Sequence, residues 1–343
     1  MATESHEKLR KAAKSSAAAS RCFFLLFVAF CCLLAAPPPS FASSSNAGGA
    51  GATFLDIGQG SARAMAMGRA FVGMADGIDA LAWNPAGIAT VGQDEFAYSY
   101  LSYLNGLDTP LYMAYVHPAG LTVWGANVGY IHDMGFDVRD TNGVPLTNLN
   151  SVVWDGYGTL SVAHSFDYEK LLLGGSVRIV NQDLAGYTQD SVVGDAGFEY
   201  RPRDFLSVGA SMQNFGAPVN VVGSIARMGF AVHPDDIVTL SFEADKPQAD
   251  TWRAGLGAEI SIPEAYLQWA QMAFRLGYYS ADQYGQSFNH TVQVLRMDRT
   301  SGLSVGFGFF TSRAFGYGLS LDYAFVPFGA LGVANQITVE VKY

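Results

Sequence analysis

The chain has 343 residues, of which only 15% are charged, while 13% are aromatic and 38 are glycine. Soluble domains usually carry charge on about a quarter of their residues, so this composition disfavours an ordinary soluble domain. The formal net charge of −10 gives an acidic surface that repels phosphate backbones, which argues against nucleic acid as a partner.

Residues 1–42 are predicted to be an export signal. Five basic residues precede the apolar run Cys22–Ala36, which is short for a membrane span and typical of a signal-peptide core. Small residues at Ser40 and Ala42 fit the −3 and −1 positions, so we predict cleavage after Ala42. All three cysteines lie inside this signal, so the mature chain would have no thiol for a disulfide, a metal site or a nucleophile. Residues 43–53 are predicted to be a flexible N-terminus.

Residues 54–92 combine apolar residues at helical spacing with small residues and an Asn84-Pro85-Ala86-Gly87 corner. Pro85 fixes its own φ and keeps Asn84 out of the helical region, while the Asn84 side chain can cap the turn that follows. Gly87 is predicted to permit a positive φ, which other residues resist. The segment is too short to bury a core of its own, so its apolar residues need a partner surface.

From Asp94 onward, apolar residues recur at every second position, which is the period of a strand. The predicted strands are mostly of about ten residues, the length that a tilted membrane strand needs. About fourteen are predicted, near residues 94–103, 109–117, 120–132, 151–165, 170–182, 190–201, 204–214, 223–233, 236–245, 251–262, 269–280, 302–311, 314–326 and 335–343.

Two further patterns favour a closed barrel. Connections alternate between tight turns, such as 117–120 and 201–204, and longer ones, such as 133–150, the stretch around Tyr187 and 281–301. Short turns on one rim and long loops on the other are typical of outer-membrane barrels. The charged residues of the strands also fall on the parity opposite the apolar set: Glu95, Asp155, Arg178, Asp195, Glu199, Arg227, Glu243, Arg253, Glu259, Arg275, Asp322 and Glu340.

We therefore predict an all-β fold, a transmembrane antiparallel β-barrel of about 14 strands over residues 93–343. The mature sequence has no run of 18 apolar residues, so helical spans are excluded. A fourteen-stranded wall leaves a lumen that its own side chains cannot fill. Residues 54–92 are predicted to fill it as a small helical plug, or hatch, that begins on the periplasmic side. A large secreted β-sandwich or a propeller is the soluble alternative.

The last predicted strand alternates apolar and polar residues and ends on an aromatic residue. Its apolar set resembles the signal by which the barrel-assembly machinery recognises its substrates, and an ordinary amphipathic strand is the alternative. The set comprises Ile337, Val339, Val341 and Tyr343.

The stretch "GSARAMAMGRAFVGMADGIDALAWNPAGIA" (60–89) resembles the entry segment of the FadL-like outer-membrane proteins, in particular the PorV/PorQ branch. "LDYAFVPFGALG…ITVEVKY" (321–343) is similar to the closing hairpin of that branch. The resemblance implies localisation in the bacterial outer membrane and places the Asn-Pro-Ala motif of the hatch on Asn84, Pro85 and Ala86. Arg69 departs from the pattern, because glycine often stands there.

The resemblance implies binding and passive transport of hydrophobic small molecules across the outer membrane. The residues it implies for the hatch or gate are Phe71, Leu81, Trp83, Asn84, Pro85, Ala86 and Gly87. One alternative is a PorV-like component of a protein secretion system that holds or shuttles secreted cargo, and another is a structural or adhesive barrel. Expected partners are outer-membrane lipid, the barrel-assembly machinery, and hydrophobic small molecules or cargo. No HExxH, GxSxG or Walker-type motif occurs and the histidines are scattered, so no enzyme, metal site or cofactor is predicted.

Overall fold

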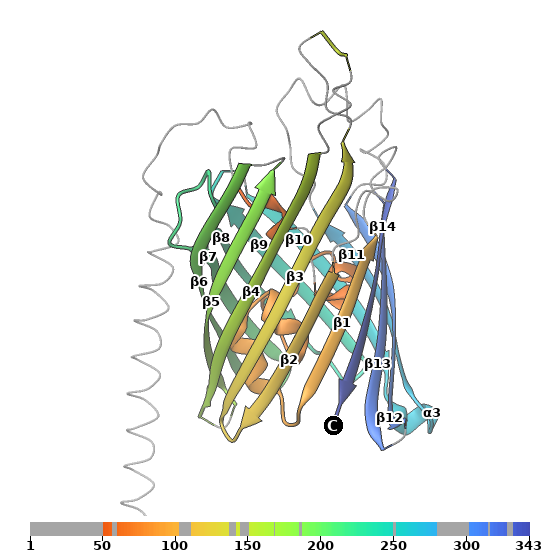
Figure 1. The fold of residues 1–343 in the computed structure, drawn as a ribbon. Coiled ribbons are helices and arrows are strands. Elements are labelled where there is room, and N and C mark those ends of the chain that lie inside the picture. Colours follow the sequence, from red (N-terminus) through yellow and green to blue (C-terminus); the bar gives the residue numbers. More distant parts are fainter. Residues whose placement is uncertain are drawn as a thin grey trace, which may run out of the picture. The chain divides into compact units, whose positions relative to one another are not determined.

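The computed structural model describes residues 51–56, 60–102, 111–136, 142–144, 151–167, 169–184, 187–249, 252–279, 302–314, 316–327 and 332–343. The predicted signal peptide, its cleavage site and residues 43–50 lie outside these ranges. In the described chain, fourteen antiparallel strands form a closed barrel in which each strand pairs with its sequence neighbours and β14 closes on β1 (Figure 1). The predicted fold class is confirmed.

The observed strands agree with the predicted ones to within four residues at either end. Their bounds are β1 (Glu95–Ser102), β2 (Leu111–Ala119), β3 (Thr122–Phe136), β4 (Ser151–Phe166), β5 (Leu171–Leu184), β6 (Tyr187–Arg203), β7 (Leu206–Phe215), β8 (Ile225–Val232), β9 (Val238–Pro247), β10 (Arg253–Ile262), β11 (Gln271–Tyr279), β12 (Leu303–Ala314), β13 (Tyr317–Pro327) and β14 (Val333–Lys342).

The connections define two rims. We call the rim that carries the β2–β3, β4–β5 and β6–β7 turns the short-turn rim, and the opposite one the long-loop rim (Figure 1). The C-terminal strand ends at the short-turn rim, where a short helix, α3 (Glu264–Leu267), also joins β10 to β11. The expected long loop around Tyr187 is wrong: β5 continues to Leu184, which pairs with Tyr187 at the start of β6, so this hairpin is extended.

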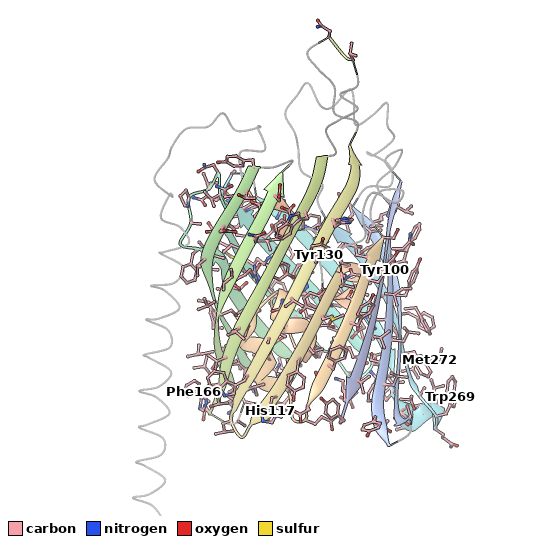
Figure 2. The ribbon with its side chains drawn as sticks, viewed as in Figure 1. Tyr100, His117, Tyr130, Phe166, Trp269 and Met272 are labelled. Atoms are coloured by element: carbon pink, nitrogen blue, oxygen red, sulfur yellow. The ribbon has the colours of Figure 1, made fainter. Side chains whose placement is uncertain are left out.

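The two faces of the wall differ as the alternation predicts. Leu160, Ile179 and Val192 point outward and are 72%, 61% and 62% exposed. Aromatic side chains are found toward both ends of this outer face, with Tyr100 and Tyr130 toward the long-loop rim and Phe166 and Trp269 toward the short-turn rim (Figure 2). None of the helices in the described chain is long and apolar enough to cross a bilayer.

The inward face carries the charges. Of the twelve charged strand residues named from parity, eleven are buried and Asp155 is half-buried. The charged residues of the wall thus face inward while its outer face is apolar, the reverse of a soluble barrel and the arrangement of a wall surrounded by lipid.

The N-terminal part of the described chain lies inside this wall (Figure 1). It forms η1 (Thr53–Asp56), α2 (Ala62–Ala66), η2 (Ile78–Ala82) and η3 (Pro85–Thr90). We call residues 60–92 the lumen segment. Its contacts reach every strand: η2 and η3 contact β1 to β6, residues 68–73 contact β7 to β11, and α2 contacts β11 to β14.

The direction of this part corrects the sequence-based expectation. The Gly51 N–H donates to the Val219 carbonyl (2.9 Å) and the Gly223 N–H donates to the Gly51 carbonyl (3.1 Å). Residues 219 and 223 join β7 to β8 at the long-loop rim, whereas Glu95 starts β1 at the short-turn rim. The chain therefore enters at the long-loop rim and crosses the lumen, and does not begin on the periplasmic side as predicted. Backbone pairing at Gly51 and burial of Phe54, which is 5% exposed, hold this end.

Candidate functional site

Inward-facing glycines let the backbone of the lumen segment lie directly against the wall. A Cβ on Gly277 would lie 2.5 Å from the Met67 carbonyl carbon and closer still to the Gly68 nitrogen. Gly68 itself has a φ of +62°, and a Cβ there would lie 2.5 Å from the Tyr278 nitrogen. No real Cβ makes such contacts, so glycine on both sides permits this close approach. The same holds where Gly174 faces Ala86, with a 2.5 Å distance to its nitrogen.

Small hydroxyl residues of the wall then bind the backbone of the lumen segment. Ser304 accepts from the Gly68 N–H (3.1 Å) and donates to the Ala66 carbonyl (3.0 Å). Thr338 accepts from the Ala62 N–H (3.0 Å), and Ser211 donates to the Trp83 carbonyl (2.9 Å). These contacts satisfy buried backbone groups outside the strand ladders, and a buried group that is left without any partner would cost about 1–3 kcal/mol.

The Asn84-Pro85-Ala86-Gly87 corner starts η3. Asn84 is extended (φ −148°) and its Oδ1 accepts from the Ala86 N–H (3.2 Å), while Pro85 takes the first helical position. The Asn84 amide also donates to the carbonyls of Val72 and Phe198, each at 3.1 Å, so it ties the corner to β6. The cap was predicted from the sequence, and the bond to β6 was not.

The predicted role of Gly87 is wrong in its physical reason. Gly87 is not among the residues with positive φ. A Cβ there would lie 2.6 Å from the Ala75 carbonyl carbon and nearer still to its oxygen. Close packing between two turns of the lumen segment, and not a positive φ, therefore requires glycine at this position.

The predicted apolar anchors are all buried and lie together. Phe71 is fully buried and makes an edge-to-face contact with Trp83, with ring centroids 6.4 Å apart. Leu81, which is 1% exposed, fills the space over Gly125, where a Cβ would lie 2.7 Å from its Cδ2. The Arg227 guanidinium covers the Trp83 ring at 4.8 Å from the centroid. Phe71, Leu81 and Trp83 form the apolar centre of the lumen segment, as expected from the sequence.

Sequence reasoning missed Glu243, the buried carboxylate of β9 that holds the middle of the lumen segment. Its Oε2 accepts from the N–H groups of Phe71 (2.9 Å) and Val72 (2.8 Å), and its Oε1 accepts from Arg227 (3.0 Å). The alternation of the strand predicted that Glu243 faces the lumen, but the sequence did not indicate which groups it would bind.

The contacts of Arg69 account for a non-glycine residue at this position. Its φ of +61° is the left-handed conformation that usually selects glycine. Its guanidinium donates to the Asp56 carbonyl (2.6 Å) and stacks over Tyr279 at 4.8 Å from the ring centroid. These contacts offset the backbone strain of a non-glycine residue there.

Asp56 gathers three guanidinium groups near the long-loop rim. Arg227 lies 3.0 Å from its carboxylate, Arg253 lies 2.7 Å away and Arg69 lies 3.6 Å away. Burial alone would raise the pKa of Asp56, but the three arginines outweigh it and lower the pKa to about 2. The carboxylate therefore stays ionised and ties η1 to β8 and β10.

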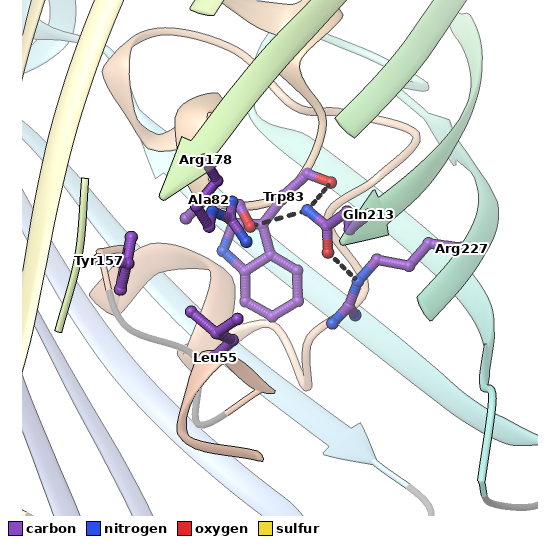
Figure 3. Close-up of a pocket in the computed structure, with 7 residues that line it drawn as sticks. All are labelled: Leu55, Ala82, Trp83, Tyr157, Arg178, Gln213 and Arg227. Atoms are coloured by element: carbon purple, nitrogen blue, oxygen red, sulfur yellow. Dashed lines mark hydrogen bonds between the residues drawn. The ribbon is translucent and has the colours of Figure 1, made fainter. Parts of the chain in front are cut away.

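Two cavities flank the lumen segment. The one toward the long-loop rim has a volume of only about 20 Å³ and is lined by Leu55, Ala82, Trp83, Tyr157, Arg178, Gln213 and Arg227 (Figure 3). Gln213 bridges it by donating to the Trp83 carbonyl (2.9 Å) and accepting from Arg227 (3.0 Å), as the dashed lines show (Figure 3). This volume is too small for an organic ligand. The other, of about 310 Å³, opens toward the short-turn rim and is strongly polar.

An apolar cluster lies next to the cavity of about 20 Å³, toward the long-loop rim. Phe54 and Ala52 of the entering chain pack against Val180, Val193 and Val222, with Leu55 and Tyr157 at its edge. Side chains of the chain's own N-terminal part thus occupy the apolar surface that the outer lumen offers.

The remaining predicted residues lie where their parity placed them. Ile337 is 43% exposed on the outer face of β14, Tyr343 is 53% exposed, and Val339 and Val341 are half-buried on the same face. Their role as an assembly signal stays a prediction. In the described chain no group of three or more His, Cys, Asp or Glu side chains is arranged to hold a metal ion.

Comparison with known proteins finds likeness at the level of structure. No family model matches the sequence, and no curated protein matches it. The toluene transporter TbuX of Ralstonia pickettii has a TM-score of 0.54 at 13% identity, covering 84% of this chain and 98% of that one. The toluene transporter TodX of Pseudomonas putida has a TM-score of 0.51 at 13% identity, covering 80% and 96%. A deltaS2 mutant of the TodX monoaromatic hydrocarbon channel has a TM-score of 0.54 at 12% identity, covering 83% and 98%.

Proposed function

We propose that the chain is a FadL-like outer-membrane protein that binds hydrophobic small molecules and lets them cross the outer membrane passively, with residues 54–92 as its hatch. The observation that carries the proposal is a lumen segment that contacts all fourteen strands of a barrel whose outer face is apolar. The likeness in fold to TodX and TbuX, which are named as toluene transporters, supports the class of cargo.

The apolar cluster in the outer lumen supports the same chemistry. Phe54 and the valines 180, 193 and 222 form a surface near the long-loop rim on which an apolar solute could replace the chain's own side chains. Below it the lumen segment closes the path, because its backbone is seated on the wall glycines. Passage therefore requires displacement of part of the hatch. The PorV-like secretion role rests on sequence resemblance alone, that of residues 60–89 and of the closing hairpin.

Conductance across planar bilayers tests the hatch. We expect low conductance from the intact protein and clearly higher conductance after deletion of residues 54–92. Trp83→Ala should also raise it, because losing a buried aromatic anchor costs about 3–5 kcal/mol. Trp252→Ala, which changes a tryptophan that is 55% exposed, is the matched control. Equal conductance in all four proteins would refute the hatch.

Uptake of radiolabelled toluene into Gram-negative cells that express the protein tests the cargo. Expression should increase the initial uptake rate, and uptake of a hydrophilic sugar of similar size should not rise. If neither solute enters faster although the barrel is folded in the outer membrane, transport of hydrophobic molecules is wrong.

A further inference from the structure

The cavity of about 310 Å³ near the short-turn rim lies between the lumen segment, β1, β6 and β14. Its charged lining comprises four carboxylates and three cations: Asp76, Asp79, Glu95, Glu340, Arg63, Arg201 and Lys342. It is reached from solvent, because the side chains of Asp76 and Lys342 are 42% and 25% exposed. A cavity of this size holds several non-hydrogen atoms.

The three cations of the lining already have partners. Arg63 binds Asp76 (2.6 Å) and Glu259 (3.0 Å), and Arg201 binds Glu199 (2.8 Å). Lys342 binds Glu95 at 2.9 Å. The cavity therefore has no cation left over to attract an anion.

The four carboxylates of the lining differ in their hydrogen-bond and ion-pair partners. Asp79 is 6% exposed, and its Oδ1 has no hydrogen-bond partner among the described residues. Glu340 lies 4.0 Å from Lys342, which is too long for a hydrogen bond. Asp79 also faces Asp322 of β13 and Asp76, and these are opposed by Arg63 and by a hydrogen bond with Ser61. A buried carboxylate oxygen without a partner costs free energy that a bound cation would recover.

We propose that this cavity is a binding site for a small organic ammonium ion, which would donate hydrogen bonds to Asp79 and Glu340. A primary ammonium has three N–H donors and one positive charge, which matches two underserved carboxylates. A directly coordinated metal ion fits less well, because no described group of acidic side chains is arranged to hold one. The site does not depend on which solute crosses the barrel.

The protonation of Asp79 supports the same conclusion. Burial, together with the nearby Asp322 and Asp76 carboxylates, raises the pKa of Asp79 to about 7, although Arg63 opposes the shift. An ammonium ion would therefore compete with a proton. Binding should therefore weaken as the pH falls from 8 to 6, because only the ionised carboxylate binds the ammonium.

Isothermal titration calorimetry of the purified protein in detergent, with n-propylammonium chloride as the probe, tests the site. At pH 8 we expect saturable 1:1 binding that Asp79→Asn weakens by roughly ten- to a hundredfold. Asp236→Asn, which removes an exposed carboxylate at the same rim, should leave it unchanged. Tetramethylammonium, which has no N–H, should bind more weakly than n-propylammonium.

Folding of the Asp79→Asn protein is checked by heat-modifiable migration on gels, and the amide is isosteric with the carboxylate. If Asp79→Asn is misfolded, Glu340→Gln serves as the second variant and should also weaken binding. The proposal is overturned if n-propylammonium does not bind, if binding is the same in these variants, or if Mg²⁺ binds in place of the ammonium with the same dependence on Asp79. None of these outcomes bears on the conductance or uptake experiments.

Discussion

Gly277→Ala is the most direct perturbation of the seat between the lumen segment and the wall. The new methyl group would point into the lumen at 2.5 Å from the Met67 carbonyl carbon, and the Gly68 nitrogen lies closer still. The backbone of the lumen segment blocks this methyl group on the lumen side. β11 cannot move outward without breaking its hydrogen bonds with β10 and β12. Gly158→Ala is the matched control, because the same methyl on the outer face would meet only Val128 Cγ1, at 3.9 Å.

Overpacking of this kind costs about 1–3 kcal/mol. Alanine in place of a strand glycine otherwise gains about 0.5–1 kcal/mol, by restricting the unfolded chain. Because this gain is common to both variants, we expect their free energies of unfolding to differ by the overpacking cost alone, about 1–3 kcal/mol. Equilibrium unfolding by guanidinium in lipid vesicles, followed by tryptophan fluorescence, measures this difference.

The two alanine variants also separate the alternatives. If they unfold at the same denaturant concentration with the same slope, the backbone of residues 67–68 is not pressed against β11, and the seat described here is incorrect. If only Gly277→Ala is destabilised but its conductance stays low, the segment is seated there and another path must carry the solute.

Three further outcomes are expected. Because three arginines depress the pKa of Asp56 to about 2, its contribution of about 2 kcal/mol is present above pH 4 and lost toward pH 2, so Asp56→Asn should flatten the stability profile over that window. Leu160→Lys places a cation on the outer face, where it costs about 2–4 kcal/mol at the bilayer midplane, so vesicle folding yields should fall, while Val144→Lys in a loop should fold normally. Glu243→Gln removes one of the two carboxylates paired with the buried Arg227 and leaves Asp56 as the other, which should lower stability by about 1–3 kcal/mol, and denaturation identical to that of the unmodified protein would show that Glu243 does not hold the lumen segment.

Much of the fold could be predicted because lipid and lumen impose a strict period on every strand. Glu95, Arg275 and Glu340 could be placed in the lumen from parity alone, since the opposite face tolerates no charge. The anchors Phe71 and Trp83 could be predicted because a short segment must find burial elsewhere.

The partners across the lumen could not be predicted, because they depend on closure of the barrel. Phe71 meets Glu243 over 172 residues of separation, and no local pattern sets that pairing. The direction of the lumen segment depends on Gly51 bonding to residues 219 and 223. One usable signal was overlooked: Gly255 and Gly257 share the parity of Arg253 and Glu259, which marks lumen positions where another backbone approaches.

The path of the entering chain has a kinetic consequence. Residue 51 is bonded at one rim and β1 starts at the other, so the chain between them is threaded through a ring of fourteen strands. Phe71 and Trp83 lie against wall backbone inside that ring, so we expect the segment to be in place before the ring closes. The strands then wrap around it, and pairing of β1 with β14 completes the enclosure.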